Sequence, residues 1–376
     1  MNILWFLAKD FDVALDVSAR LATIRHLEKN HEVTVITSYR RKKRYDYDIR
    51  SRLVYLTRGK YPLLKTWHLY KQVLDFLKKG MDLHKVDVIY INSKNYFLLK
   101  KLSKIRKSHD FKLVFDIRTL PVDPSRLKKR ISEVLFGKNL RLAAEKFDGL
   151  TYITDEMRRY CKTKYHLPDH RSEVWSSGVN LDVFKPSNSP RKNDRFRLLY
   201  HGVINRNRGI GNIVRALEKI EEKDIEVFLM GGGEGVQEVK ELIHKFHLED
   251  RVFFHPAVPH HEVPRYINEA DAGILPFPLW PGWNVSSPIK LFEYLACGKP
   301  VIVTKIPAHT DVLGGRNFAF WAENSSAEDI ASAISAAYKN KKNFKELSTQ
   351  AREFVKMNHS WERQLSRLER FLGSLS

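Results

Sequence analysis

The sequence predicts two α/β domains in tandem, each built around a doubly wound parallel sheet. The chain has 376 residues, which exceeds the roughly 100 to 200 residues of an ordinary domain. In both halves, short apolar runs of strand length alternate with longer segments of helical periodicity. Between the halves, PSNSPRKND at residues 186–194 is a polar stretch typical of a linker. We therefore expect an N-terminal domain over residues 1–186 and a C-terminal domain over residues 195–355.

Strands and helices alternate from the start of the first half. Residues 2–8 (NILWFLA) predict a strand, residues 17–28 a helix and residues 31–37 (HEVTVIT) a second strand. A strand, a helix and a strand within about 35 residues imply a parallel unit. Further strands are expected at residues 52–56, 86–91, 112–115 and 149–153.

The same alternation restarts after the linker. Residues 196–203 predict a strand, residues 210–220 a helix and residues 225–232 a second strand. A helix at 236–246, strands at 252–258, 272–277 and 299–304, and a helix beginning near Pro288 should follow. Residues 327–375 have the spacing of amphipathic helices.

Composition narrows the class of protein. Hydrophobic residues make up 43% of the chain, and it has no apolar run of about 18 residues, so we expect a globular protein without a membrane-spanning helix. The first apolar run meets Lys9 and Asp10, which favours a buried strand over an export signal. Cys161 and Cys297 form neither a disulfide framework nor a metal motif, in keeping with a cytoplasmic location.

The formal net charge of +21 predicts an anionic partner, because such an excess creates a long-range field. Dense basic runs stand in the first half, at residues 40–44, 100–107 and 126–130. Apolar residues lie near them, namely Phe111, Leu127, Ile131, Leu135 and Phe136. Together they favour a first half that rests on an anionic membrane surface. Solvated surface segments remain the alternative for each single run.

Two glycine-bearing strand ends in the second half are candidates for anion binding. In YHGVINRNRG, Gly202 lets backbone amides approach a ligand, and Arg206 and Arg208 supply positive charge. This pattern predicts a diphosphate clamp, with a surface loop as the alternative. At the second strand end, MGGGEG, the glycines have no side chains, so a ligand could pass close to the backbone. A tight turn would use the same residues.

A third strand end, NVSSPIKLFEYLACGKPV, carries the strongest pattern. Ser287 is a good N-cap and Pro288 suits the first helical position, so a helix should begin there with its positive end free to bind phosphate. Lys290 and Glu293 share one helix face. A cation would thus lie near the phosphates, and a carboxylate one turn deeper could accept hydrogen bonds from ribose hydroxyls. An exposed ion pair between the two is the alternative.

The string SPIKLFEYLACGKPVI resembles the signature helix of the retaining glycosyltransferases of family 4, which have the two-domain GT-B fold. Further similar motifs follow in the family's order along most of the chain: HEVTVIT, DGLTYITDEM, SSGVNLDVFKP, HGVINRNRG, EADAGILP and HSWERQ. The resemblance implies two Rossmann-like domains that face each other across a cleft, the first for an acceptor and the second for a nucleotide sugar. It also implies that residues 356–376 form a helix packing back toward the N-terminal domain.

The resemblance assigns roles to single residues. Arg208 matches a diphosphate-binding lysine, Glu293 the second glutamate of a pair that holds the ribose, and Gly233 a glycine beside the nucleotide. The predicted donor-binding residues are Gly202, Gly233, Ser286, Ser287, Pro288, Leu291 and Glu293. The predicted catalytic residues are Arg206, Arg208, Lys290 and Arg118.

One departure from the family pattern concerns the paired glutamates. The first of them should stand eight positions before Glu293, where this chain has Val285. Its contact with the donor sugar or acceptor would have to come from hydroxyl, amide or backbone groups of a neighbouring residue. The candidates are Asn284, Ser286 and Ser287. The identity of the donor therefore stays open.

Another departure concerns charge. The family's arginine after the first glycine is replaced by Val203, and Arg206 is the candidate to restore it. In the first half, Arg118 follows the strand KLVF where many relatives carry a histidine or arginine facing the sugar, with a surface arginine as the alternative. His260 and His261 lack a third ligand at metal spacing, so we expect them on the surface and expect neither a catalytic metal nor a cofactor.

The sequence thus predicts transfer of a hexosyl unit from a UDP- or GDP-linked sugar to a lipid-linked or saccharide acceptor. The resemblance implies retention of configuration, and the basic half indicates cell-surface polysaccharide or glycolipid synthesis at the inner face of the cytoplasmic membrane. A nucleotide-sugar epimerase of the same fold is the alternative enzyme. An NAD-dependent oxidoreductase is disfavoured because MNILWFLAKDFD contains no glycine. No recognised module supports a nucleic-acid-binding protein.

Overall fold

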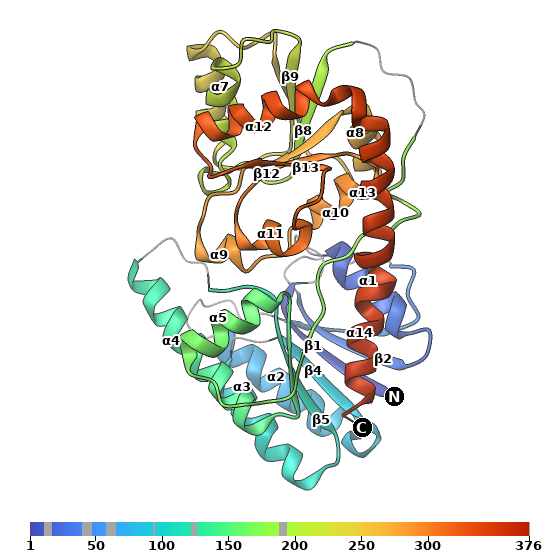
Figure 1. Cartoon of the computed structure of the whole chain (residues 1–376). Coiled ribbons are helices and arrows are strands. Elements are labelled where there is room, and N and C mark those ends of the chain that lie inside the picture. Colours follow the sequence, from blue (N-terminus) through green and yellow to red (C-terminus); the bar gives the residue numbers. More distant parts are fainter. Residues whose placement is uncertain are drawn as a thin grey trace. The chain divides into compact units, whose positions relative to one another are not determined.

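The structure is a computed structural model that describes residues 1–10, 17–39, 47–57, 65–92, 95–121, 126–187 and 194–375. It divides into two compact units (Figure 1). The first consists of Met1–Ser176 with Trp361–Ser376, and the second of Ser177–Ser360. The basic run at residues 40–44 lies outside the described residues.

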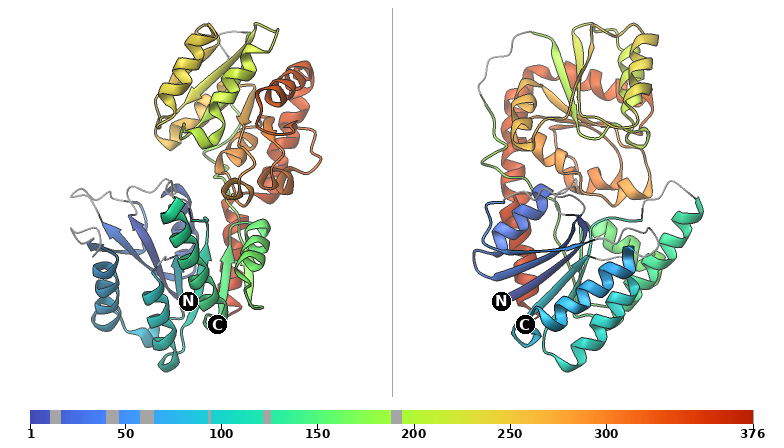
Figure 2. Two further views of the ribbon diagram at one scale, coloured as in Figure 1. Left: turned by 90° about the vertical axis from the view of Figure 1, so that its left-hand side faces the viewer. Right: turned by 180° about the vertical axis from the view of Figure 1, so that it is seen from behind.

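The first unit contains a seven-stranded sheet whose neighbouring strands are all parallel. Its strands are β1 (Asn2–Asp10), β2 (Glu32–Tyr39), β3 (Arg52–Thr57), β4 (Val88–Asn92), β5 (Lys112–Ile117), β6 (Gly149–Tyr152) and β7 (Ser172–Val174). The order β3-β2-β1-β4-β5-β6-β7 shows that the chain winds outward in both directions from β1 and β4. Central strands such as β4 are apolar and buried because helices cover both faces (Figures 1 and 2).

The helices of the first unit come from both ends of the chain. They are α1 (Val17–Leu27), α2 (Lys65–Lys79), α3 (Tyr96–Ile105), α4 (Arg126–Lys146), α5 (Asp155–Tyr165) and α14 (Trp361–Gly373), with 3₁₀ turns at Leu83–Lys85 and Arg106–Ser108. Helix α14 packs against α1 and buries Leu365 and Leu368 in the first core. Its Glu369 bonds to His26 at 2.9 Å and to His31 at 2.7 Å.

The second unit repeats this architecture with six strands, again all parallel. They are β8 (Phe196–His201), β9 (Ile225–Met230), β10 (Val252–His255), β11 (Ala272–Leu275), β12 (Val301–Thr304) and β13 (Ala319–Ala322). The order β10-β9-β8-β11-β12-β13 is the doubly wound arrangement of dinucleotide-binding sheets.

The helices of the second unit flank its sheet. They are α6 (Ile210–Glu218), α7 (Val236–Lys245), α8 (Val263–Glu269), α9 (Pro281–Asn284), α10 (Ile289–Ala296), α11 (Pro307–Leu313), α12 (Ala327–Lys339) and α13 (Phe344–Asn358). The described part of this unit also contains 3₁₀ turns at Arg206–Arg208, His260–Glu262 and Lys341–Asn343. Helix α6 packs against both α7 and α12, and α10 packs against α13.

The predicted fold class is confirmed, and the two compact units meet ten residues before the boundary expected from the sequence. The structure changes unit after Ser176, whereas the sequence prediction extends the first domain to residue 186. The reason is that Phe184 is buried in the second core, where Arg352 donates to its carbonyl oxygen at 2.5 Å. The polar stretch at 186–194 therefore follows the change of unit. Likewise, the chain returns to the first unit at Trp361 and not at residue 356.

Candidate functional site

The candidate site lies at the carboxyl edge of the second sheet, around the ends of β8 and β11. Ligands of doubly wound sheets bind at this edge, where the strand order reverses, and here that point lies between β8 and β11. After β8 the chain passes through Gly202 into the 3₁₀ turn Arg206–Arg208 and then into α6. The structure therefore places the predicted glycine and arginine loop at this edge.

Two glycines let this loop pack directly against neighbouring loops. Gly233, which follows β9, has a φ of +146°, and a Cβ there would lie 2.3 Å from the carbonyl oxygen of Ile204. Gly209 has a φ of +74°, and a Cβ there would lie 2.2 Å from the carbonyl oxygen of Pro276. Any other residue would be strained and would clash at both positions. In the structure, Gly233 thus serves loop packing.

Lys290 extends from the first turn of α10 to the end of β8. Its Nζ donates to Tyr200 Oη at 3.3 Å and lies 4.3 Å from the centre of that ring. The same atom lies against Gly202, where an added Cβ would come within 2.7 Å of it. Glycine at this position therefore leaves room for the amine. The predicted clamp loop and the predicted helix meet at Lys290.

Arg208, at the end of the 3₁₀ turn, packs against two aromatic side chains. Its guanidinium carbon lies 4.9 Å from the ring centre of Trp283 and 5.8 Å from that of Phe277. The two rings stack at 4.7 Å, and Trp283 Nε1 donates to the carbonyl oxygen of Asn207 at 2.6 Å. Aromatic faces hold a guanidinium without neutralising it. Arg208 Nε is buried and has no hydrogen-bond partner among the described residues.

Lys290 and Arg208 therefore form a pair of uncompensated cations. Within the described ranges, neither forms an ion pair with a carboxylate, and the nearby Glu293 pairs with histidines instead. Burial, and then repulsion by Arg208, hold the pKa of Lys290 well below its ordinary value, although Glu293 opposes this. A bound anion would supply the missing negative charge to both side chains. The pair has the electrostatics of an anion-binding site.

Glu293 lies one helical turn beyond Lys290 and is only 3% exposed. His260 Nε2 bonds to its Oε1 at 2.6 Å, whereas His201 Nε2 lies 3.3 Å from Oε2 without hydrogen-bonding geometry. Burial favours the protonated acid, but the hydrogen bond from His260, followed by the positive charges of neighbouring side chains, lowers the pKa of Glu293. The carboxylate is therefore charged near neutral pH. Because it is buried and unpaired with Lys290, the alternative of an exposed ion pair is excluded.

The pKa values of the two histidines shift in opposite directions. The hydrogen bond to Glu293 raises the pKa of His260, whereas burial lowers the pKa of His201 to about 4. His260 can thus donate a charge-assisted hydrogen bond to the carboxylate. His201 is neutral, and its backbone N–H donates to Tyr294 Oη at 3.1 Å.

Arg206 points away from this group. Its side chain is 81% exposed, and its Nε donates to Glu238 Oε2 of α7 at 2.7 Å. Successive residues of a 3₁₀ turn are about 120° apart, so Arg206 and Arg208 face different directions. The structure does not bring Arg206 together with Lys290.

The start of α10 differs from the prediction by one residue. The helix begins at Ile289, Pro288 occupies the N-cap position, and no side chain caps it. Ser287, the predicted cap, is buried, and its Oγ accepts from the Ser177 N–H at 3.2 Å. This long-range contact takes the place of the expected cap. Leu291 is fully buried in the core, so only its backbone can reach a ligand at the helix start.

The residues around the position of the missing glutamate differ in whether their polar atoms already have hydrogen-bond partners. Val285 is buried, with 1% of its surface exposed. Ser286 Oγ donates to the carbonyl oxygen of Trp283 at 2.7 Å, and the Ser287 hydroxyl is engaged as described. Asn284 Oδ1 is buried without a hydrogen-bond partner in the described part of the chain. Of the three candidates, Asn284 therefore keeps an unused acceptor.

Arg118 belongs to a second polar cluster, at the carboxyl edge of the first sheet. Its guanidinium stacks 3.8 Å from the Trp175 ring centre, and Nη1 donates to the Trp175 carbonyl oxygen at 2.7 Å. Asp116, at the end of β5, accepts from Thr151 Oγ1 at 2.8 Å and lies 3.5 Å from Asn92 Nδ2. Burial raises the pKa of Asp116, and Arg118 opposes that shift. Hydrogen bonds and a stacked ring thus tie this cluster together internally.

His260 was expected on the plain surface, but it contacts the candidate site. The side chain is half exposed, but its Nε2 bonds to Glu293. The aromatic partners of the cations were missed as well, namely Tyr200, Phe277 and Trp283. The one available signal was the aromatic density of FPLWPGW directly before the signature helix.

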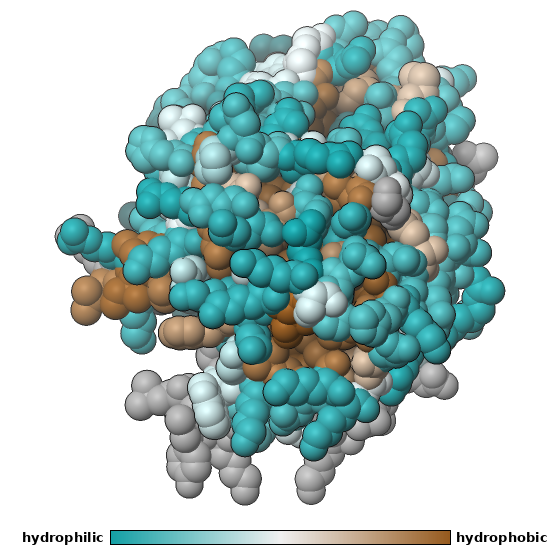
Figure 3. All heavy atoms as spheres, turned by 90° about the horizontal axis from the view of Figure 1, so that it is seen from below, coloured by the Kyte–Doolittle hydropathy of each residue, from teal (hydrophilic) through white to brown (hydrophobic). Residues whose placement is uncertain are grey.

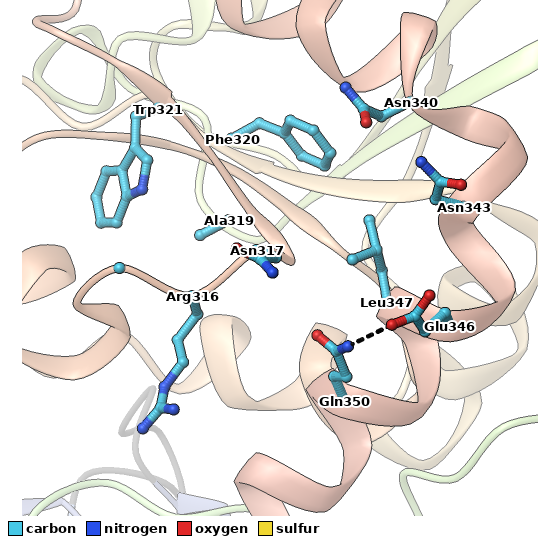
Figure 4. A pocket seen from close by; sticks show the side chains of 11 residues that line it. Arg316, Asn317, Ala319, Phe320, Trp321, Asn340, Asn343, Glu346, Leu347 and Gln350 are labelled. Atoms are coloured by element: carbon cyan, nitrogen blue, oxygen red, sulfur yellow. Dashed lines mark hydrogen bonds between the residues drawn. The ribbon is translucent and has the colours of Figure 1, made fainter.

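A cavity of about 660 Å³ opens elsewhere in the second unit, beside β13 and α13 (Figure 4). Amide and aromatic side chains line it, including Asn317, Phe320, Trp321, Asn343 and Gln350. None of the predicted donor-binding residues does so. The loop site and this cavity are therefore separate.

Two family models match the chain, one in each half. Glycosyltransferase Family 4 matches residues 21–183, and Glycosyl transferases group 1 matches residues 184–354. A D-inositol 3-phosphate glycosyltransferase from Arthrobacter sp. (strain FB24) is 26% identical over 187 residues, which are 46% of this chain and 43% of the relative. TuaH of Bacillus subtilis (strain 168), a glycosyltransferase named for teichuronic acid biosynthesis, is 47% identical over 53 residues, 14% of this chain and 13% of TuaH. The matched segments thus span less than half the length of these relatives.

Solved structures match over the full chain. Sucrose-phosphate synthase from Thermosynechococcus elongatus has a TM-score of 0.80 at 18% identity and covers 100% of both chains. Anabaena HepE, solved in complex with UDP, has a TM-score of 0.76 at 14% identity and also covers 100% of both. At such identities the likeness establishes the fold. Together with the two family models, it shows that the chain belongs to the group 1 glycosyltransferases of GT-B fold.

Proposed function

We propose that this glycosyltransferase moves a hexosyl unit from a nucleotide diphosphate sugar held by the second unit. The observation that carries the proposal is the uncompensated pair Lys290 and Arg208, which meets the Gly202 loop at the switch point of a doubly wound sheet. A diphosphate carries the negative charge that this pair lacks. The same cations would stabilise the leaving diphosphate as its oxygen separates from the sugar carbon. The acceptor oxygen then bonds to that carbon, and the acceptor's hydroxyl proton passes to the diphosphate.

Glu293 would hold the ribose of the donor. A carboxylate offers about four lone-pair positions, and the two histidines face one oxygen each. At least one position on each oxygen then remains for the two vicinal hydroxyls. His260 would act by fixing the carboxylate in its charged state. The amide oxygen of Asn284 is the group we propose in place of the missing first glutamate.

For the donor we favour a UDP-linked hexose and keep a GDP-linked one as the alternative. HepE was solved with UDP and with UDP-glucose, and TarM with UDP, which supports a uridine nucleotide for chains of this fold. Retention of configuration stays a proposal that rests on the family resemblance. Metal-free transfer is proposed too, because Lys290, Arg208 and the helix start can carry the charge. In the described ranges, no three His, Cys, Asp or Glu residues are grouped to hold a metal.

For the acceptor we propose a lipid-linked or saccharide substrate at an anionic membrane, in cell-surface polysaccharide or glycolipid synthesis. The charge of +21 supports an anionic surface. The names of two relatives, TuaH and D-inositol 3-phosphate glycosyltransferase, support a saccharide or a phosphorylated polyol as acceptor. Among the described residues, every helix is too short or too polar to span a bilayer. We propose a peripheral position on the inner face of the cytoplasmic membrane, without a role for nucleic acid.

A thermal-shift panel of nucleotide sugars tests the donor proposal. A ligand at 100 times its dissociation constant adds about 2.7 kcal/mol to the free energy of unfolding, so the right donor should raise the melting temperature clearly. UDP-hexoses should do so, and NAD should not. If NAD shifted the melting temperature and no nucleotide sugar did, the proposal would be wrong.

A further inference from the structure

The first part of α4 carries a row of exposed apolar side chains. Leu127 is 70% exposed, Ile131 53%, Val134 54% and Leu135 45%. Large aliphatic side chains rarely gather in the open on one helix, because each gains about 1.5 to 3 kcal/mol when it is buried. The helix changes character at Phe136, from which point it packs into the first unit.

These side chains share one face. At 3.6 residues per turn, the positions 127, 131, 134 and 135 fall within an arc of about 100°. Lys129 and Glu133, on the opposite side, are less exposed. In Figure 3, apolar side chains gather at the left-hand edge, which is the side on which α4 lies in Figure 1. Hydrophilic side chains cover most of the rest of the face shown. We call Leu127, Ile131, Val134 and Leu135 the α4 stripe.

Cations border the α4 stripe. Lys128 and Arg130 lie on its two edges by helical spacing, and Lys138 follows it along the same face. All three are exposed. Glu133, the one acidic residue in this part of the helix, lies 3.4 Å from Lys164 of α5 and so does not cancel them. The pattern of an apolar face with basic edges is that of helices that lie in the surface of an anionic bilayer.

We propose that the α4 stripe inserts into the interfacial layer of an anionic membrane, with Lys128 and Arg130 on the lipid headgroups. The inference rests on the proposed membrane location and names the surface that performs it. It also corrects the sequence expectation. Phe111 and Phe136, which were grouped with this surface, are buried in the fold and take no part.

A second copy of the chain fits the α4 stripe less well. Pairing two such faces would bring Lys128 and Arg130 of one copy against the same residues of the other, which costs energy through like-charge repulsion. The net charge of +21 adds to that repulsion. A negatively charged bilayer instead satisfies both the apolar face and its basic edges.

Sedimentation with phosphatidylcholine vesicles that contain phosphatidylglycerol tests the proposal on the full chain. The double variant Ile131→Ser with Leu135→Ser should lower the partition constant at least about tenfold. Met357→Ser, at an exposed apolar position of α13, should leave it unchanged. Because all three side chains are exposed, the melting temperature should not change in either variant.

Site-specific fluorescence adds a test that does not depend on affinity. Ile131→Cys can be labelled selectively, because burial raises the pKa of both native thiols, Cys161 and Cys297, to about 12. An environment-sensitive dye at this position should shift to the blue on vesicles and be quenched by nitroxide lipids. The same dye at Met357→Cys should show neither effect.

The outcomes separate the two proposals. If the wild-type chain does not bind the vesicles at all, the membrane location itself is wrong. If the wild type binds but the double variant binds equally well, or the dye at position 131 stays in water, the α4 stripe is not the docking surface. A change from dimer to monomer in the double variant, with vesicle binding unchanged, would assign the stripe to a second copy and overturn the inference.

Discussion

The two sheets have similar doubly wound strand orders, but the polar and charged groups at their carboxyl edges differ in how they are paired. In the second unit, Lys290 and Arg208 rest on aromatic rings, and no carboxylate among the described residues forms an ion pair with them. In the first unit, Asp116 is tied to Thr151, which also contacts the Tyr90 hydroxyl at 3.1 Å. The strand order thus determines where a ligand can bind, and the side chains at that edge determine which ligand charge is favoured. In the described part of the chain, the basic side chains of the second edge have no carboxylate partner, whereas the polar groups of the first edge bond to one another.

The largest expected effect is a difference between the two units in how much their unfolding free energy changes on acidification. Burial lowers the pKa of His201 and of His309, in the second unit, to about 4, against about 6.5 when unfolded. Their stabilising contribution is complete above the unfolded pKa and is lost as the pH falls through the folded one. Each should cost the second unit up to about 3 kcal/mol of unfolding free energy between about pH 6.5 and 4. Asp116, whose pKa is raised, should have the opposite sign in the first unit.

Urea unfolding at several pH values, followed by limited proteolysis to tell the units apart, measures this contrast. The variant His309→Asn should reduce the acid sensitivity of the second unit, because it removes one of these two buried histidines. If the first unit lost stability sooner on acidification, or if His309→Asn changed nothing, the account of the buried histidines would be wrong.

Glu293→Gln should weaken donor binding about 100-fold, since two hydrogen bonds to a charged acceptor become weaker bonds to a neutral amide. The substitution preserves volume in the buried site. Isothermal titration with UDP measures the effect. A matched exchange at an exposed acid, Glu328→Gln, should have none. Equal affinity of both variants would remove Glu293 from the donor site.

Asp116→Ala should lower the unfolding free energy of the first unit by about 2 kcal/mol, because the buried Thr151 hydroxyl loses an acceptor. Its effect on UDP affinity should be small, since the donor is assigned to the other unit. Urea unfolding and titration of the same sample check both statements. A large loss of UDP affinity in a stably folded variant would contradict the division of roles.

His260→Asn should have the smallest effect, about a fivefold loss of UDP affinity, because a neutral donor replaces a charge-assisted one. In the wild type, affinity should decline as the pH rises through the raised pKa of His260, since the imidazolium then loses its proton. The variant should lack that decline. The same pH profile in both proteins would show that His260 does not act on Glu293.

Local pattern predicted most of the fold and about half of the candidate site. Among the described strands, apolar runs located every one except β7 and β13, which have three and four residues. Lys290, Arg208 and Glu293 were predictable because each stands on a motif whose spacing fixes its neighbours. Contacts between distant segments were not: His260 reaches Glu293 from a 3₁₀ turn, and Ser177 takes the Ser287 hydroxyl. Nor does spacing reveal that one arginine of a 3₁₀ turn faces outward, as Arg206 does.

The central claim is that Lys290 and Arg208 bind the diphosphate of the donor. The most direct measurement compares the affinities for UDP and for uridine in the wild type, Lys290→Met and Arg208→Met. Each variant should lose about 10- to 100-fold in affinity for UDP and almost none for uridine. If UDP affinity stayed unchanged in both variants, or fell only as much as uridine affinity, the diphosphate would have to be bound elsewhere.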